Sequence, residues 1–127
     1  EKVSFKKLIK LQRCVAVADG FYEWKRIEKE KTPYYFLRED KKLIYIAGIY
    51  EEDQFCMITE EASSNVTEIH HRQPVILNES DVNKYLNIEI SGSNYLKQSQ
   101  KSKLSFYEIS KDVNKPTNNN ISLIQPI

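Results

Sequence analysis

Two short segments of the chain place ionisable side chains among aromatic and aliphatic residues. One reads A-D-G-F-Y-E-W-K and holds Glu23 between two aromatic residues. The other reads I-H-H-R-Q-P-V-I-L and holds His70 and His71, the only histidines of the sequence. A carboxylate that is buried beside an imidazole can transfer protons near neutral pH. Glu23 and the two histidines are therefore the first candidates for acid–base chemistry.

Each of these residues, taken alone, also has a purely structural interpretation. Strand alternation points Glu23 to the opposite face from Tyr22 and Trp24, so its carboxylate either faces solvent or points into a cleft. A lone histidine is commonly a hydrogen-bonded structural residue. Adjacent histidines on a strand point to opposite faces, and no third ligand is spaced near them, so we expect no metal site.

The composition is that of an ordinary soluble globular protein. The chain has 127 residues, of which 29% are charged, and its formal net charge is +1. This length is enough for one core and too short for two ordinary domains. The charge is uneven, because the first thirteen residues hold four lysines and Arg13 against Glu1 alone. Such a run is either the solvated face of a helix or a track for phosphates.

The spacing of the cysteines and the hydropathy of the chain indicate in which cellular compartment the protein acts. Cys14 and Cys56 lie far apart in apolar runs, without the spacing of a zinc site or a disulfide framework, which fits a reducing cytosol. No apolar stretch reaches membrane-spanning length, and the amino terminus does not have the shape of a signal peptide. We therefore expect a cytoplasmic protein with no membrane partner, no metal and no cofactor.

The hydrophobic pattern predicts an α+β fold that is dominated by strands, as a mostly antiparallel sheet or a partly open barrel with a few short helices. The dipeptide Asp19-Gly20 indicates a tight turn between the first two strands. Strands are predicted at 14–17, 21–25, 34–38, 43–50, 55–59 and 104–109.

Few helices are predicted. A weakly amphipathic pattern favours a helix at 4–11, and Ser80 is a candidate N-cap for a short helix at 81–86. Residues 61–66 fit one or two helical turns. Residues 83–100 fit either a helix or a loop, and residues 115–120 an exposed loop.

Six segments, in this order along the chain, together resemble the SOS response-associated peptidase (SRAP) family, which shields abasic sites in single-stranded DNA. The D-G-F-Y-E-W and I-H-x-R-x-P-V-I-L motifs are the specific ones, and the resemblance covers nearly the whole chain. The segments are R-C-V-A-V-A-D-G-F-Y-E-W-K, T-P-Y-Y-F, A-G-I-Y-E, M-I-T-E-E-A, I-H-H-R-Q-P-V-I-L and Y-E-I-S-K-D-V-N.

The resemblance implies a role for five residues. Glu23 matches the glutamate that handles protons in the family's active site, and His70 matches the histidine that works beside it on the sugar. Trp24, Thr59 and Arg72 match residues that line the site or contact the DNA backbone. A guanidinium is suited to this contact because it can bind a phosphate bidentately.

The family's nucleophile is an amino-terminal cysteine, whose α-amine and thiol condense with the aldehyde of an abasic site to give a thiazolidine. This sequence begins at Glu1 and lacks the M-C-G-R opening and the half of the domain that follows it. We therefore interpret residues 1–127 as a single domain, the carboxy-terminal portion of an SRAP domain. We expect this portion to be inactive without the cysteine, and open sheet edges could let it form homo-oligomers.

Three hypotheses about function follow. In the first, the full-length protein is an abasic-site sensor that crosslinks covalently to single-stranded DNA and removes its own amino-terminal methionine. In the second, the chain is a non-catalytic fragment that binds single-stranded DNA through aromatic and basic residues. The third is a cysteine hydrolase that uses Cys14 with His70, which the apolar strand around Cys14 disfavours.

The first hypothesis makes a geometric prediction. The side chains of Glu23 and His70, far apart in sequence, should meet in one cleft because a base and an acid must act on the same sugar. Thr59 and Arg72 should lie at the wall of that cleft.

Overall fold

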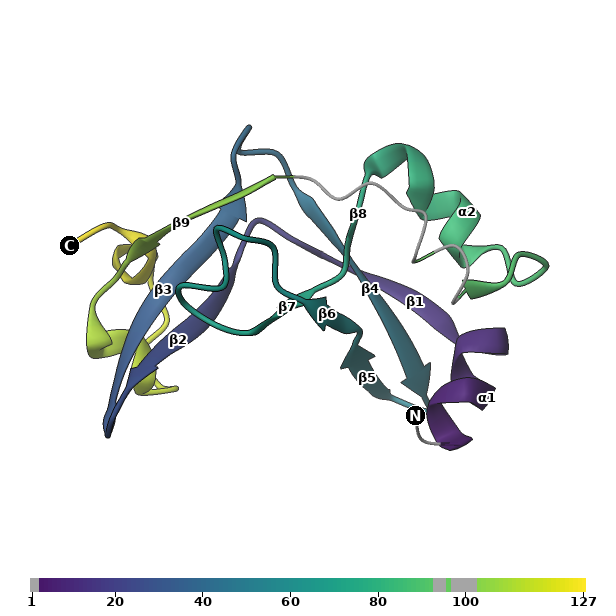
Figure 1. Cartoon of the computed structure of the whole chain (residues 1–127), viewed down its shortest axis with the longest axis horizontal. Helices are drawn as coiled ribbons and strands as arrows, with labels where there is room; N and C mark the ends of the chain where they lie inside the picture. Colours follow the sequence, from purple (N-terminus) through teal and green to yellow (C-terminus); the bar gives the residue numbers. More distant parts are fainter. Residues whose placement is uncertain (1–2, 93–95, 97–102) are drawn as a thin grey trace. The chain divides into compact units, whose positions relative to one another are not determined.

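The computed structural model describes residues 3–92, 96 and 103–127, and the chain forms two compact units (Figure 1). The first unit consists of Glu1–Ala18, Leu43–Glu60 and Pro74–Ser102, and the second of Asp19–Lys42, Glu61–Gln73 and Lys103–Ile127. Each unit is therefore assembled from three separate stretches of sequence, and each is described below by itself.

The first unit is built around one central strand. Strand β4 (Ile44–Glu51) pairs antiparallel with β1 (Arg13–Ala18), β5 (Gln54–Met57) and β8 (Ile76–Leu77). Apolar side chains from the helices α1 (Val3–Leu11) and α2 (Val82–Leu86) pack against this sheet. The buried core residues are Ile9, Ala47, Ile49, Ile58, Val75, Leu77 and Tyr85.

The helix predicted at 4–11 is confirmed as α1, whose lysines are exposed while Leu8 and Ile9 face the core. The short helix predicted at 81–86 is confirmed as α2, but Ser80 is not its N-cap. A 3₁₀ turn, η1 (Glu79–Asp81), precedes α2 and begins at Asn78, whose carbonyl accepts a hydrogen bond from the Asp81 N–H. Ser80 lies inside that turn, so its hydroxyl is not placed to cap the helix.

Arg13 joins helices α1 and α2. Its guanidinium is buried and donates hydrogen bonds to the carbonyl oxygens of Ile9 (2.6 Å), Tyr85 (2.7 Å), Asn87 (3.2 Å) and Ile90 (2.5 Å). These oxygens lie at or beyond the carboxyl ends of α1 and α2, where carbonyl groups lack partners within the helix and a cation is favourable. Arg13 therefore has a structural role in the first unit.

The second unit contains a three-stranded antiparallel sheet in the order β2–β3–β9. The strands are β2 (Phe21–Ile27), β3 (Glu30–Arg38) and β9 (Leu104–Glu108). Strands β2 and β3 form a hairpin with the two-residue loop Glu28-Lys29, and Glu28 adopts a φ of 54°. Within the described residues, strand β2 lies at one edge of this sheet.

Aromatic rings on both faces hold this sheet together. Phe36 stacks on Phe21 at 5.1 Å between ring centroids and contacts Phe106 at 5.0 Å. On the opposite face, Tyr35 lies between Tyr22 and Tyr107 at 5.9 and 5.8 Å. Offset and tilted ring pairs at such distances contribute beyond simple burial. Two short 3₁₀ segments, η2 (Lys111–Asn114) and η3 (Ile121–Ile124), follow β9.

The tight turn predicted at Asp19-Gly20 does not join two paired strands. Strand β1 pairs with β4 and β2 pairs with β3, so at this point the chain passes from the first unit into the second. Gly20 is needed for close approach, because a Cβ there would lie 2.3 Å from the Tyr35 ring and 2.6 Å from the Phe36 carbonyl oxygen. The chain does bend at Asp19 between the two predicted strands, and the turn signal left open which strands pair.

The strand predicted at 55–59 divides into β5 and the short β6 (Thr59–Glu61), which pairs with β7 (Arg72–Pro74). Residues 61–66 do not form a helix. They leave β6 and enter a run of hydrogen-bonded turns, in which the N–H groups of Val66 and Thr67 donate to the Ser63 carbonyl. This run brings the chain to His70.

The remaining strand predictions each overlap one observed strand, and residues 115–120 form a largely exposed loop as expected. Residues 83–100, predicted as helix or loop, lie partly outside the described residues. Antiparallel pairings with few short helices confirm the strand-dominated α+β class. No helix within the described residues is long and apolar enough to cross a membrane.

Candidate active site

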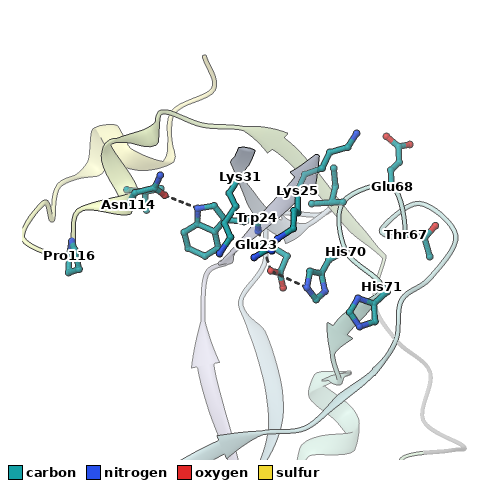
Figure 2. Close-up of a pocket in the computed structure, with 13 residues that line it drawn as sticks. Glu23, Trp24, Lys25, Lys31, Thr67, Glu68, His70, His71, Asn114 and Pro116 are labelled. Carbon is teal, nitrogen blue, oxygen red and sulfur yellow. Dashed lines mark hydrogen bonds and ion pairs between the residues drawn. The ribbon is translucent and has the colours of Figure 1, made fainter. Parts of the chain in front are cut away.

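An open cavity of about 1010 Å³ lies in the second unit, and all the residues that line it belong to that unit (Figure 2). They come from the β2–β3 hairpin, from the turns that end at His71, and from η2 with the residue Pro116 beyond it. Three stretches that are distant in sequence thus form one cavity.

Glu23 and His70 face each other in this cavity (Figure 2). His70 Nε2 lies 3.8 Å from Glu23 Oε1, and the two side chains are 34% and 27% exposed. The backbone N–H of Trp24 donates to Glu23 Oε1 at 3.1 Å, which fixes the carboxylate at the edge of β2. The prediction that these two side chains meet in one cleft is therefore confirmed.

His70 is positioned by the turns that precede it. Its backbone N–H donates to the Val66 carbonyl oxygen. The side chains of Val66 and Ile69 are buried, and they hold the turn that precedes His70 in place. The backbone nitrogen of Arg72 lies 3.2 Å from His70 Nδ1. The Arg72 carbonyl oxygen lies 3.2 Å from the same ring nitrogen, so Nδ1 either accepts from the Arg72 N–H or donates to the Arg72 carbonyl oxygen, depending on the tautomer of the ring. In both tautomers the backbone of Arg72 orients the imidazole so that Nε2 faces Glu23.

His71 stacks on His70, with ring centroids 4.7 Å apart and an interplanar angle of 25°, and both line the cavity. The expectation that the adjacent histidines point to opposite faces was wrong, because they precede β7 and lie outside any strand. Within the described residues, no group of three or more histidine, cysteine, aspartate or glutamate side chains is placed to hold a metal ion.

Trp24 is held by a residue that the sequence interpretation missed. Its indole Nε1 donates to Asn114 Oδ1 at 2.7 Å (Figure 2). Its ring lies 6.4 Å from that of Tyr22, which strand alternation places on the same face of β2. Ser110 caps η2 by accepting from the Asp112 N–H, which fixes the segment that carries Asn114. The only sequence signal was that Asn114 ends the Y-E-I-S-K-D-V-N motif.

The structure does not bring all the predicted site residues together. Arg72 is exposed, and its side chain is not among those that line the cavity, although its backbone contacts the His70 ring. Thr59 belongs to the first unit. The roles of Thr59 and Arg72 in DNA binding remain predictions.

Cys14 is a poor nucleophile. It lies in β1 with an intermediate exposure, and burial raises the pKa of its thiol above the ordinary value. A raised pKa reduces the fraction of reactive thiolate at neutral pH. Cys56, by contrast, is exposed.

The fold and cavity define an α+β protein with a carboxylate–imidazole pair at the edge of an antiparallel sheet. The chain belongs to the SOS response associated peptidase (SRAP) family, which matches residues 1–116. The membership expected from the motifs is thus confirmed.

Two relatives that are named as abasic site processing proteins agree with this family, and one solved structure shares the fold. The chain is 34% identical to abasic site processing protein YMR114C of Saccharomyces cerevisiae, over 91% of this chain and 36% of that protein. It is 32% identical to abasic site processing protein YoqW of Bacillus subtilis, over 98% of this chain and 62% of that protein. A crystal structure of a protein from Bacteroides thetaiotaomicron matches with a TM-score of 0.85 and 27% identity, over 100% of this chain and 62% of that one. The chain thus spans less than two thirds of the length of these relatives.

Proposed function

We propose that the protein processes abasic sites in DNA, the activity for which its relatives YMR114C and YoqW are named. In its full-length form it crosslinks covalently to abasic sites in single-stranded DNA through a thiazolidine and removes its own amino-terminal methionine. Residues 1–127 supply the carboxy-terminal portion of one SRAP domain. The observation that carries the proposal is the 3.8 Å approach of Glu23 and His70 in a cavity of an SRAP family member.

The proposed reaction needs proton transfers that this pair can perform. The α-amine of the terminal cysteine condenses with the sugar aldehyde and expels water, and the thiol then adds to the imine and passes its proton to the nitrogen. In our proposal Glu23 accepts a proton from the nucleophile, and His70 donates its Nε2 proton to the leaving oxygen. A positioned acid or base typically contributes about 10²–10⁴-fold to the rate.

DNA contacts come from residues around the pair. Trp24, held by Asn114, offers an aromatic face on which an unpaired base can stack. Arg72, Thr59 and the basic residues of α1 contact the phosphate backbone in this proposal. Stacking requires bases that are not already paired, so single strands are preferred over duplex. We also propose that the protein acts in the cytoplasm. A further part of the proposal is that the chain forms homo-oligomers through the open edges of its sheets.

The test uses a form of the protein with the family's amino-terminal cysteine and a single-stranded oligonucleotide with one abasic site. Adducts are followed in time on a denaturing gel. Glu23→Gln and His70→Gln should each slow adduct formation by about 10²-fold or more, because each removes a proton donor or acceptor while keeping a similar shape. Glu68→Gln is the matched control, because Glu68 lines the same cavity without facing His70 within ion-pair distance. Its rate should equal that of the wild type.

Two results would contradict the proposal. Equal rates for the wild type and Glu23→Gln would remove the acid–base role of this carboxylate. A heat-stable and detergent-stable adduct from the 127-residue chain alone would show that the nucleophile lies within it. Reversible binding of single strands, with no adduct from any form, would support the alternative of a non-catalytic binding protein.

A further inference from the structure

Two cations face each other on the β2–β3 hairpin beside the active-site cavity. The register of the hairpin places Arg26 directly opposite Lys31, and both residues line the cavity together with Trp24. Like charges at directly opposed positions destabilise an antiparallel pair. Arg26 and Lys31 therefore form a pair of like charges beside the cavity, and their repulsion lowers the stability of the β2–β3 hairpin.

Within the described part of the chain, neither Arg26 nor Lys31 forms an ion pair with an acidic side chain. Glu23 and Glu68 also line the cavity, but Glu23 faces His70, and no ion pair forms between either carboxylate and Arg26 or Lys31. Lys25, the neighbouring residue, adds a third cation to the lining. An anion bound between Arg26 and Lys31 would turn the repulsion into attraction.

The position of the pair on the strand indicates which anion it binds. Strand alternation puts Arg26 on the same face of β2 as Trp24, two residues away and thus displaced by about 7 Å along the strand. The opposed Lys31 shares that face, as the opposed Pro33 does beside Trp24. A nucleotide whose base stacks on the Trp24 indole would carry its phosphate next to these two cations.

We infer that Arg26 and Lys31 form a phosphate-binding subsite for a nucleotide strand that enters the cavity over Trp24. This inference deepens the proposed function, because it names two residues that hold the strand beside the Glu23–His70 pair. The two cations bind the backbone of any single strand, since a phosphate is present whether or not the neighbouring sugar has lost its base.

The experiment measures binding of the 127-residue chain to an undamaged, fluorescently labelled oligothymidylate by anisotropy over a series of salt concentrations. The test variant is Arg26→Gln/Lys31→Gln. The matched control is Lys41→Gln/Lys42→Gln, which removes the same two charges from exposed positions of the second unit away from the cavity. The thermal midpoint of each variant is recorded in parallel.

The test variant should bind more weakly, and the slope of log K against log salt should become shallower by about 0.7 for each phosphate that the variant no longer neutralises. Its thermal midpoint should equal or exceed that of the wild type, because a repulsive pair is removed from the hairpin. The control should keep the wild-type slope. These results are independent of crosslinking, since the oligonucleotide has no abasic site.

Three outcomes would overturn the inference. An unchanged slope in the test variant would show that neither cation binds a phosphate. An equal loss of affinity in the control would show that the weaker binding of the test variant comes from its lower net charge and not from a specific subsite. A lower thermal midpoint together with weaker binding would show that Arg26 and Lys31 stabilise the fold, and that binding weakens because the variant is less stable. If instead the slope changes as expected while the full-length protein forms no adduct, the subsite holds and the crosslinking function fails.

Discussion

The hydrogen bond from Trp24 to Asn114 can be tested with unusual directness, because Trp24 is the only tryptophan of the chain. Asn114→Ala removes the acceptor of this hydrogen bond. The indole then keeps the ring contact with Tyr22, at 6.4 Å between centroids, which is the other contact that we identify for it. We therefore expect the ring to sample more orientations while the sheet stays folded.

The size of the effect follows from the nature of the bond. It joins a half-buried indole to an exposed amide at 2.7 Å, so its net contribution is at the lower end of the usual range, about 0.5–1 kcal/mol. This free energy corresponds to about a twofold to fivefold fall in the ratio of held to released indole. Global stability should change by no more than the same amount.

The assay is intrinsic fluorescence with acrylamide quenching, together with the single indole N–H signal in a nitrogen-15 correlation spectrum. Asn114→Ala should increase quenching and shift the indole signal, whereas Asn114→Asp, which keeps an acceptor oxygen, should preserve both. Asn119→Ala is the matched control, because Asn119 is exposed and makes no hydrogen bond to another described residue. Identical quenching and indole shifts in Asn114→Ala and wild type would refute this account of how the ring is held.

Three further predictions concern stability and reactivity. Arg13→Ala should lower the free energy of unfolding by about 3–5 kcal/mol in urea, because buried carbonyl oxygens lose a charged donor, and an unchanged midpoint would contradict this. Burial, and after it the carboxylate of Asp19, raises the pKa of Tyr35 from 10.0 to about 12. In the unfolded state Tyr35 therefore loses its proton at a lower pH than in the folded state. The stability that this difference contributes is present below pH 10 and should be lost as the pH rises toward about 12. Circular dichroism measures the alkaline unfolding, and Tyr35→Phe should remove this pH-dependent loss of stability. Iodoacetamide should alkylate Cys56 faster than Cys14, as mass spectrometry of peptides would show, and faster labelling of Cys14 would revive the cysteine-hydrolase hypothesis.

The strands could be predicted from the sequence because their alternation of apolar and polar residues is local. Their pairing could not, because Asp19-Gly20 is a local turn signal at a point where the chain changes units. The actual hairpin loop gave no signal of this kind. Glu28 adopts a positive φ that glycine or asparagine would normally occupy, so the sequence at the hairpin is that of an ordinary charged stretch.

The candidate site was predicted in part for a similar reason. Glu23 and His70 were found because both lie within specific family motifs, and the structure brings their side chains together. Asn114 was missed because its role depends on a contact with Trp24 across 90 positions of sequence. The stacking of His71 on His70 depends on the chain staying out of a strand at these residues, which no periodicity in the sequence indicates.

The position of β2 at the edge of its sheet, within the described residues, would let one short segment serve both the chemistry and the DNA binding of the proposed function. Glu23 and Trp24 are consecutive, so strand alternation sends their side chains to opposite faces, yet both line one cavity. In a central strand, neighbouring strands would separate the two faces, and no single ligand could reach both. At an edge no neighbouring strand separates the two faces, so one ligand in the cavity could reach both the Glu23–His70 pair and the Trp24 indole. A flexible strand with unpaired bases can bend around such an edge, whereas a duplex with its bases stacked inside cannot, and this difference supports the preference for single strands in the proposed function.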